Sequence, residues 1–284
     1  MLGPLLALLS SGLWGTADFL GGSLARRLPV LSVMVLSQSA ALIAVAAVVP
    51  LSGGLLAPGA YLGWGVGFGL IGMVALASFY RALAVGKMGV VAPIAASGVA
   101  IPVLVGLAGG DDPAAHQIAG MVLAVAGIVL ASIPGSPDEE SHSDPGAGLQ
   151  AVGLAFVAAM GFGTVIVFIE RGGRTSVGMT LLAARCASVM LLLAVVLLRR
   201  PDPGPWRPDL RLLVGLGLLD VAANGAIAVA QRYADLSLTS VLGSIYPVVT
   251  VLLARRVHHE RLSRGQAAGV TAALVGVVLI ASTP

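Results

Sequence analysis

The sequence predicts an all-α integral membrane protein whose ten transmembrane helices form two inverted repeats of five helices. Three observations support this prediction: a composition that suits lipid better than water, ten apolar runs of membrane-spanning length, and a constant spacing between matching residues of the two halves. The first defines the solvent, the second defines the elements, and the third defines their arrangement.

The composition places most of the chain in lipid. Of its 284 residues, 57% are hydrophobic and 10% are charged, whereas a soluble domain carries about 25% charged residues. A folded chain of this kind cannot cover itself with a water-compatible surface, so we expect a multi-pass protein of the cell membrane. The net charge of +3 comes from arginines dispersed among short connections, which predicts charges flanking a membrane and no nucleic-acid partner.

Ten apolar runs are long enough to cross a bilayer, which takes about 20 residues per helix. Because backbone hydrogen bonds must be satisfied inside lipid, these runs are expected to be helices. The first run has no basic segment before it and no small-residue cleavage site, so we expect a retained span and not a signal peptide. The runs are 2–24, 29–50, 60–85, 89–108, 115–133, 149–169, 176–198, 210–233, 237–256 and 264–282.

A polar stretch, PGSPDEESHSDPGAG at 134–148, divides the chain into a first repeat at 1–133 and a second at 149–284. The motif GLWGT at 12–16 lies 148 positions before MGFGT at 160–164. Since each half contains an odd number of spans, the second half enters the membrane from the opposite side, as in many secondary transporters. Further matches lie 149 positions apart (260 − 111): Asp111 with Glu260, Gln117 with Gln266, Gly120 with Gly269, and Gly127 with Gly276.

Several motifs resemble those of a known family. These are Trp14-Gly15, RALAVGKMGVVAP at 81–93, and YPVVTVLLARRVHHERLSRGQAAGV at 246–270. The chain resembles the EamA-type permeases of the drug/metabolite transporter superfamily over both halves. The resemblance implies a ten-helix exporter of a small polar metabolite, such as an amino acid, driven by protons. Asp111 stands where the family usually has Glu, which preserves the charge.

Four charged residues interrupt the apolar runs: Asp18, Arg81, Arg185 and Asp220. A charge at the centre of a membrane helix costs about 2.5–3.5 kcal/mol on insertion scales, so such residues usually face a cavity or a partner. Arg81 lies near the end of its span and is expected to extend to the interface. The other three are candidates for a transport site.

Arg185 has two interpretations that do not exclude each other. Its planar guanidinium suits a bidentate contact with a substrate carboxylate, or it forms a structural ion pair with Asp220. Asn224 follows Asp220 by four residues and shares its helix face. We therefore include Arg185 and Asn224 among the expected substrate-binding residues.

Asp18 is the first proton-coupling candidate. If it faces a central cavity, it can bind and release a proton in each transport cycle. Otherwise it lies near the end of its span and reaches interfacial water, although Arg26 is about 12 Å further along the helix. Asp220 is the rival proton carrier.

Other polar and aromatic residues complete the expected site. Gln38 falls near the repeat equivalent of Arg185, and polar residues at matching places in both halves are typical of a site at the repeat interface. Trp14, Tyr80 and Tyr246 are expected to line the cavity, unless they serve packing or interface anchoring. Matching interruptions also predict kinked or discontinuous helices that act as hinges; the residues are Pro93, Pro102, Gly243 and Pro247.

The alternative class is a membrane-embedded enzyme acting on a lipid-linked substrate. It needs a cluster of carboxylates or histidines at one membrane face. The two clusters in the sequence, Asp111-Asp112 and His258-His259-Glu260, fall on opposite faces of the ten-span map. We therefore expect no enzyme, no metal and no cofactor, with lipid, a small-molecule substrate and protons as partners.

The orientation of the termini has two opposed indications. On the side of the termini the connections hold Arg171, Arg174 and Arg232, whereas the opposite side holds eleven basic residues. The positive-inside rule therefore predicts termini outside, while the family resemblance implies termini in the cytoplasm.

Overall fold

The computed structural model describes residues 2–51, 59–86, 88–131, 145–258 and 264–281. These residues are helical with short connections, and no strand occurs among them. The helices are α1 (Leu2–Ala25), α2 (Val30–Leu51), α3 (Ala60–Val85), α4 (Met88–Ala96), η1 (Ser97–Val99), α5 (Ala100–Ala108), α6 (Ala115–Ala131), α7 (Pro145–Gly173), α8 (Val177–Arg199), η3 (Arg207–Asp209), α9 (Leu210–Ala230), α10 (Leu236–Gly243), α11 (Tyr246–His258) and α12 (Arg264–Ala281).

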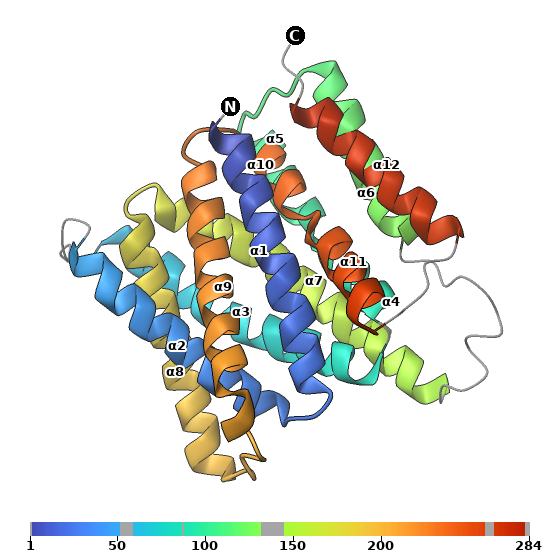
Figure 1. Cartoon of the computed structure of the whole chain (residues 1–284). Coiled ribbons are helices and arrows are strands. Elements are labelled where there is room, and N and C mark those ends of the chain that lie inside the picture. The colour runs from blue at the N-terminus through green and yellow to red at the C-terminus, as the bar shows by residue number, and fades with distance from the viewer. Residues whose placement is uncertain (1, 52–58, 87, 132–144, 259–263, 282–284) are drawn as a thin grey trace.

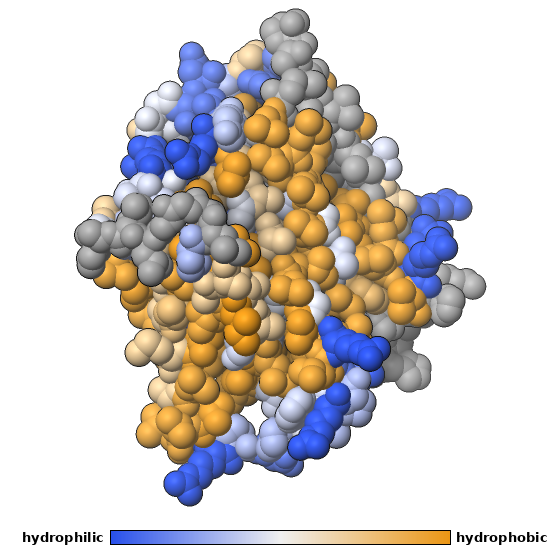
Figure 2. Space-filling view, turned by 60° about the vertical axis from the view of Figure 1, so that its left-hand side comes forward, coloured by the Kyte–Doolittle hydropathy of each residue, from blue (hydrophilic) through white to orange (hydrophobic). Residues whose placement is uncertain are grey.

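Seven helical segments of the described chain are long and apolar enough to cross a membrane. Two of them, Met88–Ala108 and Leu236–Val257, each run through an interrupted pair of helices. Large apolar side chains are exposed along the segments, for example Ile43, Leu104 and Met190. Figure 2 shows the resulting broad apolar surface, with hydrophilic residues gathered at its margins. This surface suits the acyl chains of a bilayer.

Helices of the first half pack mainly on helices of the second half. α1 lies against α9, α3 against α7, and α6 against α12, while α2 contacts both α8 and α9. In Figure 1, α6 and α12 form a pair at one edge of the molecule, whereas α1, α3, α7 and α9 surround its centre. The two halves therefore share one core instead of forming separate domains.

Small residues allow the closest of these contacts. A Cβ atom on Gly15 of α1 would lie 2.5 Å from the carbonyl oxygen of Tyr246. A Cβ atom on Gly163 of α7 would collide in the same way with the carbonyl oxygen of Gly98. Close approach of helix backbones through glycine is a common packing mode in membranes. Both glycines and both carbonyls lie 148 positions apart.

The fourth and ninth predicted spans are both interrupted near the middle. α4 continues through the 3-10 turn η1 into α5, with Pro93 inside α4 and Pro102 inside α5. α10 ends at Gly243, and α11 begins at Tyr246, just before Pro247. The α-helix is therefore interrupted in both segments, by a 3-10 turn in the first and by the two non-helical residues 244–245 in the second.

Two connections differ from the simplest expectation. α7 already begins at Pro145, inside the predicted linker, because proline is well tolerated in the first turn of a helix. Asp111 accepts a hydrogen bond from the backbone N–H of Ser237 at 2.9 Å. The carboxylate thus caps the N-terminus of α10, across the two halves. Its repeat counterpart Glu260, and most of the predicted linker, lie outside the described residues.

Candidate functional site

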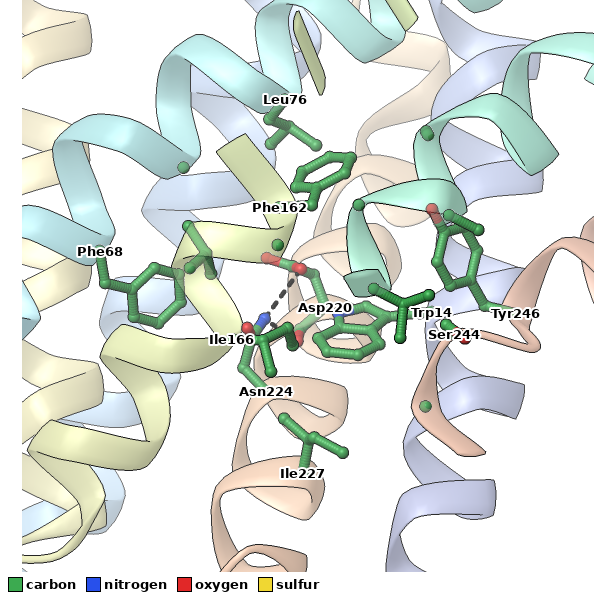
Figure 3. Close-up of a pocket in the computed structure, with 18 of the residues that line it drawn as sticks. Trp14, Phe68, Leu76, Phe162, Ile166, Asp220, Asn224, Ile227, Ser244 and Tyr246 are labelled. Carbon is green, nitrogen blue, oxygen red and sulfur yellow. Dashed lines mark hydrogen bonds between the residues drawn. The ribbon is translucent and has the colours of Figure 1, made fainter. Parts of the chain in front are cut away.

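A cavity of about 100 Å³ lies at the centre of the molecule. Both halves build it, because its lining residues come from α1, α2, α3, α4, η1, α5, α7, α8, α9, α10 and α11. The side chains labelled in Figure 3 lie around this space, from Leu76 and Phe162 on one side to Ile227 and Tyr246 on the other. The polar or titratable lining residues are Asp18, Gln38, Arg185, Asp220, Asn224, Ser240, Ser244 and Tyr246, with Trp14 beside them.

Arg185 holds together the polar side of the cavity. Its side chain is 2% exposed, and its Nη1 atom donates to Oε1 of Gln38. Its Nη2 atom lies 3.1 Å from Oδ2 of Asp220, and its Cζ atom lies 5.6 Å from the ring centre of Phe68. A buried cation is stable only when it is paired, and here the partners come from α2, α3 and α9.

Asp220 is the second centre of this cluster. Its Oδ1 atom accepts from Nδ2 of Asn224 at 3.0 Å, and its Oδ2 atom accepts from Nε2 of Gln38 at 3.3 Å. Gln38 therefore bridges Arg185 and Asp220, accepting from one and donating to the other. The Asp220 side chain is 19% exposed, which leaves part of the carboxylate accessible from the cavity.

Several buried polar atoms around the cavity have hydrogen-bonding capacity to spare. Within the described chain, Nε of Arg185, Oγ of Ser240 and the hydroxyl of Tyr246 make no hydrogen bond. Leaving such groups unsatisfied is costly in a dry interior. Their placement around one cavity therefore favours a polar ligand that completes these bonds.

Asp18 and Trp14 bring α1 into the same cavity. Trp14 packs edge-on against Tyr246 of α11, with ring centres 6.5 Å apart and an interplanar angle of 73°. Asp18 lies one helical turn further along α1 and lines the cavity. The lining thus combines a carboxylate with aromatic surface, and three ionisable groups of both signs meet there.

Nine of the twelve residues expected from the sequence meet in this cavity. The three others, Tyr80, Pro93 and Pro247, do not line it. Tyr80 is buried beside Phe79, and its ring fills the space next to Gly21. The nine that the structure brings together are Trp14, Asp18, Gln38, Pro102, Arg185, Asp220, Asn224, Gly243 and Tyr246.

Arg81 is exposed, as expected for a side chain that extends to the interface. It therefore takes no part in the cavity. Of the four charges that interrupt apolar runs, only Asp18, Arg185 and Asp220 lie there.

The sequence predicted nine of the 24 lining residues and missed the other 15. An apolar side chain in an apolar helix carries no signal of its own, since lipid-facing and cavity-facing positions look alike. The repeat does carry a signal, because residues 148 positions after or before a predicted lining residue are candidates themselves. That rule finds Phe162 from Trp14, Ile166 from Asp18, and Leu76 from Asn224, all of which line the cavity.

No group of three or more metal-ligating side chains occurs among the described residues. The predicted cluster of His258, His259 and Glu260 is not among them, because the side chain of His258 and the whole of His259 and Glu260 lie outside the described part of the chain.

The apolar surface, the membrane-spanning helices and the enclosed polar centre define a multi-pass membrane protein. Residues 149–282 match the model of the EamA-like transporter family. The second half of the chain is thus similar to this transporter family, and over these residues the match agrees with the resemblance predicted from the sequence motifs.

The whole chain also shares its fold with solved structures. One crystal structure of a protein is 21% identical, with a TM-score of 0.75, and the match covers 98% of this chain and 96% of the other. A search of curated proteins found no match. The structural likeness therefore supports the fold over both halves, including the first half.

Proposed function

We propose that the protein carries a small polar metabolite, an amino acid or a related compound, out of the cell by alternating access. The observation that supports this most is the central cavity, where Asp18, Arg185 and Asp220 gather inside an otherwise apolar membrane protein. Charges in membrane helices usually mark a substrate or ion pathway. The transporter family matched by the second half is consistent with this role.

The proposed architecture is ten helices in two inverted repeats, 1–133 and 149–284. Contacts between helices support it, because α1 packs on α9 as α7 packs on α3, and α2 packs on α9 as α8 packs on α3. These pairs exchange when the two halves are exchanged. Arg185 and Gln38, which lie near equivalent places, bond to each other, as expected near the axis that relates two repeats.

In this proposal, Arg185 binds the carboxylate of the substrate. Asp220 holds the guanidinium while the cavity is empty, and the substrate competes with it. The partly exposed Asp220 and the Nε atom of Arg185, which makes no hydrogen bond, support such an exchange of partners. Gln38 and Asn224 keep Asp220 hydrogen-bonded, and Trp14 and Tyr246 provide aromatic surface for the rest of the substrate.

Asp18 is the proposed proton carrier, with Asp220 as the alternative. Asp18 lines the cavity, so a proton that it holds is exchangeable with the transport pathway. The interrupted segments α4–η1–α5 and α10–α11 are the proposed hinges, with Pro93, Pro102, Gly243 and Pro247 at or near the interruptions. Of these, Pro102 and Gly243 line the cavity.

Uptake of labelled amino acids, nucleosides and sugars into proteoliposomes, with and without a pH gradient, tests this function. We expect saturable uptake of one class that the gradient enhances. Asp18→Asn is expected to abolish gradient-driven accumulation while exchange of substrate continues. Driven accumulation in that variant would instead point to Asp220, and wild-type uptake equal to that of empty liposomes for every solute would contradict transport.

A further inference from the structure

Two walls of the cavity differ in chemistry; Gln38 of α2 and Arg185 of α8 also line the cavity and belong to neither wall. One wall, from α3, α7 and the α4–η1–α5 segment, consists of side chains without polar groups, which we call the apolar wall. The other, from α1, α9 and the α10–α11 segment, carries Asp18, Asp220, Asn224, Ser240, Ser244 and Tyr246, and we call it the polar wall. Figure 3 shows Leu76 and Phe162 lying across the cavity from Tyr246 and Ser244.

The two walls are built from equivalent positions of the two halves. Asp18 and Ile166 are 148 positions apart, as are Leu76 and Asn224, and both members of each pair line the cavity. Ala96 and Ser244 form another such pair. The same backbone positions thus hold a polar side chain on one wall and an apolar side chain on the other.

A ligand in this cavity meets very different surroundings on its two sides. A polar group against the apolar wall loses its bonds to water and finds no partner, which is costly. Against the polar wall the same group faces residues with polar side chains, among them Asp18, Asp220 and Asn224. An apolar group has the opposite preference, so the walls fix the orientation of the ligand.

We infer that the cavity selects an amphipathic amine, with its ammonium-bearing head on the polar wall and an apolar body against the apolar wall. This inference rests on the proposed function and narrows its substrate class. Leu76 and Ile166 are specificity-determining residues in this assignment, because each is apolar where the equivalent position of the other half has a polar residue.

Binding in detergent tests the selectivity without requiring transport. The chain has three tryptophans, and Trp14 is the one that lines the cavity. A Trp64→Phe/Trp206→Phe variant therefore leaves Trp14 as a fluorescent reporter of cavity binding. The probes are L-leucine and L-asparagine, which have the same head and bodies of nearly equal size, and 3-methylbutylamine, which keeps the body and the ammonium of leucine.

We expect L-leucine to bind about tenfold more tightly than L-asparagine, since an unpaired buried amide carries a penalty of that order. We expect 3-methylbutylamine to bind more weakly than leucine, because it has no carboxylate to pair with Arg185. Leu76→Asn is expected to bring the affinities of leucine and asparagine within about threefold of each other, because it places a hydrogen-bonding partner on the apolar wall. Leu70→Asn is the matched control. It lies on the same helix with an exposed side chain, and it should leave the ratio unchanged.

Ile166→Asn provides a second variant on α7, with the same expected loss of selectivity, in case Leu76→Asn does not fold. Equal affinity for leucine and asparagine in the parent protein, tighter binding of asparagine, or no binding of any probe would overturn the inference. Saturable transport of asparagine with an affinity equal to that for leucine would do so while leaving the transport function intact. Selective binding without transport would contradict the proposed function alone.

Discussion

The two halves of the chain meet through backbone contacts that match and cavity side chains that do not. Gly15 packs on the carbonyl of Tyr246 as Gly163 packs on the carbonyl of Gly98. At the cavity, by contrast, Asp18 has a charged side chain, whereas its repeat counterpart Ile166 has an apolar one. Close helix contacts tolerate only small residues, whereas a cavity accepts any side chain that its surroundings can stabilise. Chemical asymmetry is therefore compatible with a symmetrical backbone.

The largest expected effect comes from filling a backbone contact of Gly98 that lies next to one of the matched contacts. A Cβ atom on Gly98 would collide with the backbone carbonyl of Ala159, which cannot move without displacing α7. We expect Gly98→Val to prevent folding. The added side chain clashes with backbone atoms, and only a costly shift of the backbone could remove the clash. Size-exclusion chromatography of the detergent-solubilised protein measures this as loss of the monodisperse peak.

Gly63→Ala is the control for that variant, since a Cβ atom on Gly63 meets nothing within 4 Å. It should leave the chromatographic peak unchanged. A folded Gly98→Val variant with normal thermal stability would mean that the α7–η1 contact does not limit packing.

The next largest effect concerns the charges that differ between the halves. Arg185→Met leaves Asp220 without its cation in a mostly buried place, and breaking a buried pair costs about 3–5 kcal/mol. We expect a large drop in the thermal unfolding temperature in detergent. Arg185→Met/Asp220→Leu should recover part of the loss, because it removes both charges. If the single variant unfolds at the wild-type temperature, the cluster does not stabilise the fold.

A smaller effect is expected at the cap of α10. Asp111→Ala removes the acceptor for the N–H of Ser237, and loss of a helix cap costs about 1 kcal/mol. A modest decrease in unfolding temperature should follow. Asp112→Ala, at the exposed neighbouring position, is the matched control and should have less effect. Equal effects of the two variants would mean that the hydrogen bond itself contributes nothing.

The smallest effect depends on pH. Burial, followed by the nearby carboxylates of Asp111 and Asp112, raises the pKa of Asp235 from its ordinary value of 3.8. A raised pKa in the folded state means that folding favours the protonated form, so stability falls as pH rises from 3.8 through the folded-state value. The Asp235→Asn variant should therefore have a slightly higher unfolding temperature than the wild type at pH 7. The difference should vanish below about pH 4, and a constant difference at all pH values would exclude this origin.

Much of the helical layout could be predicted because lipid restricts the chain so strongly. The predicted run at 60–85 coincides with α3, and the others end within a few residues of the described helices. The break between α10 and α11 was predicted only as a kinked or discontinuous helix, because Gly243 and Pro247 permit an interruption without fixing its extent. Local sequence does not show how far the backbone unwinds.

The charged residues of the candidate site could be predicted from the sequence. Arg185, Asp220 and Asp18 stand out because a charge in an apolar run needs a reason, and all three line the cavity. Tyr80 carries the same aromatic signal as Tyr246, yet it packs against Gly21 outside the cavity. The direction of an aromatic side chain depends on which helix lies beside it, and this is set by tertiary packing.

Access to the cavity from both sides of the membrane is the most direct test of the central claim. Ser240 lines the cavity, and Ser240→Cys changes its shape little; Cys186, the one native cysteine, is exposed and is replaced by alanine in this background. Labelling with a membrane-impermeant maleimide is measured in sealed vesicles of each orientation. Alternating access predicts labelling in both orientations, slowed by substrate. Labelling from one side only, or from neither, would contradict transport through this cavity.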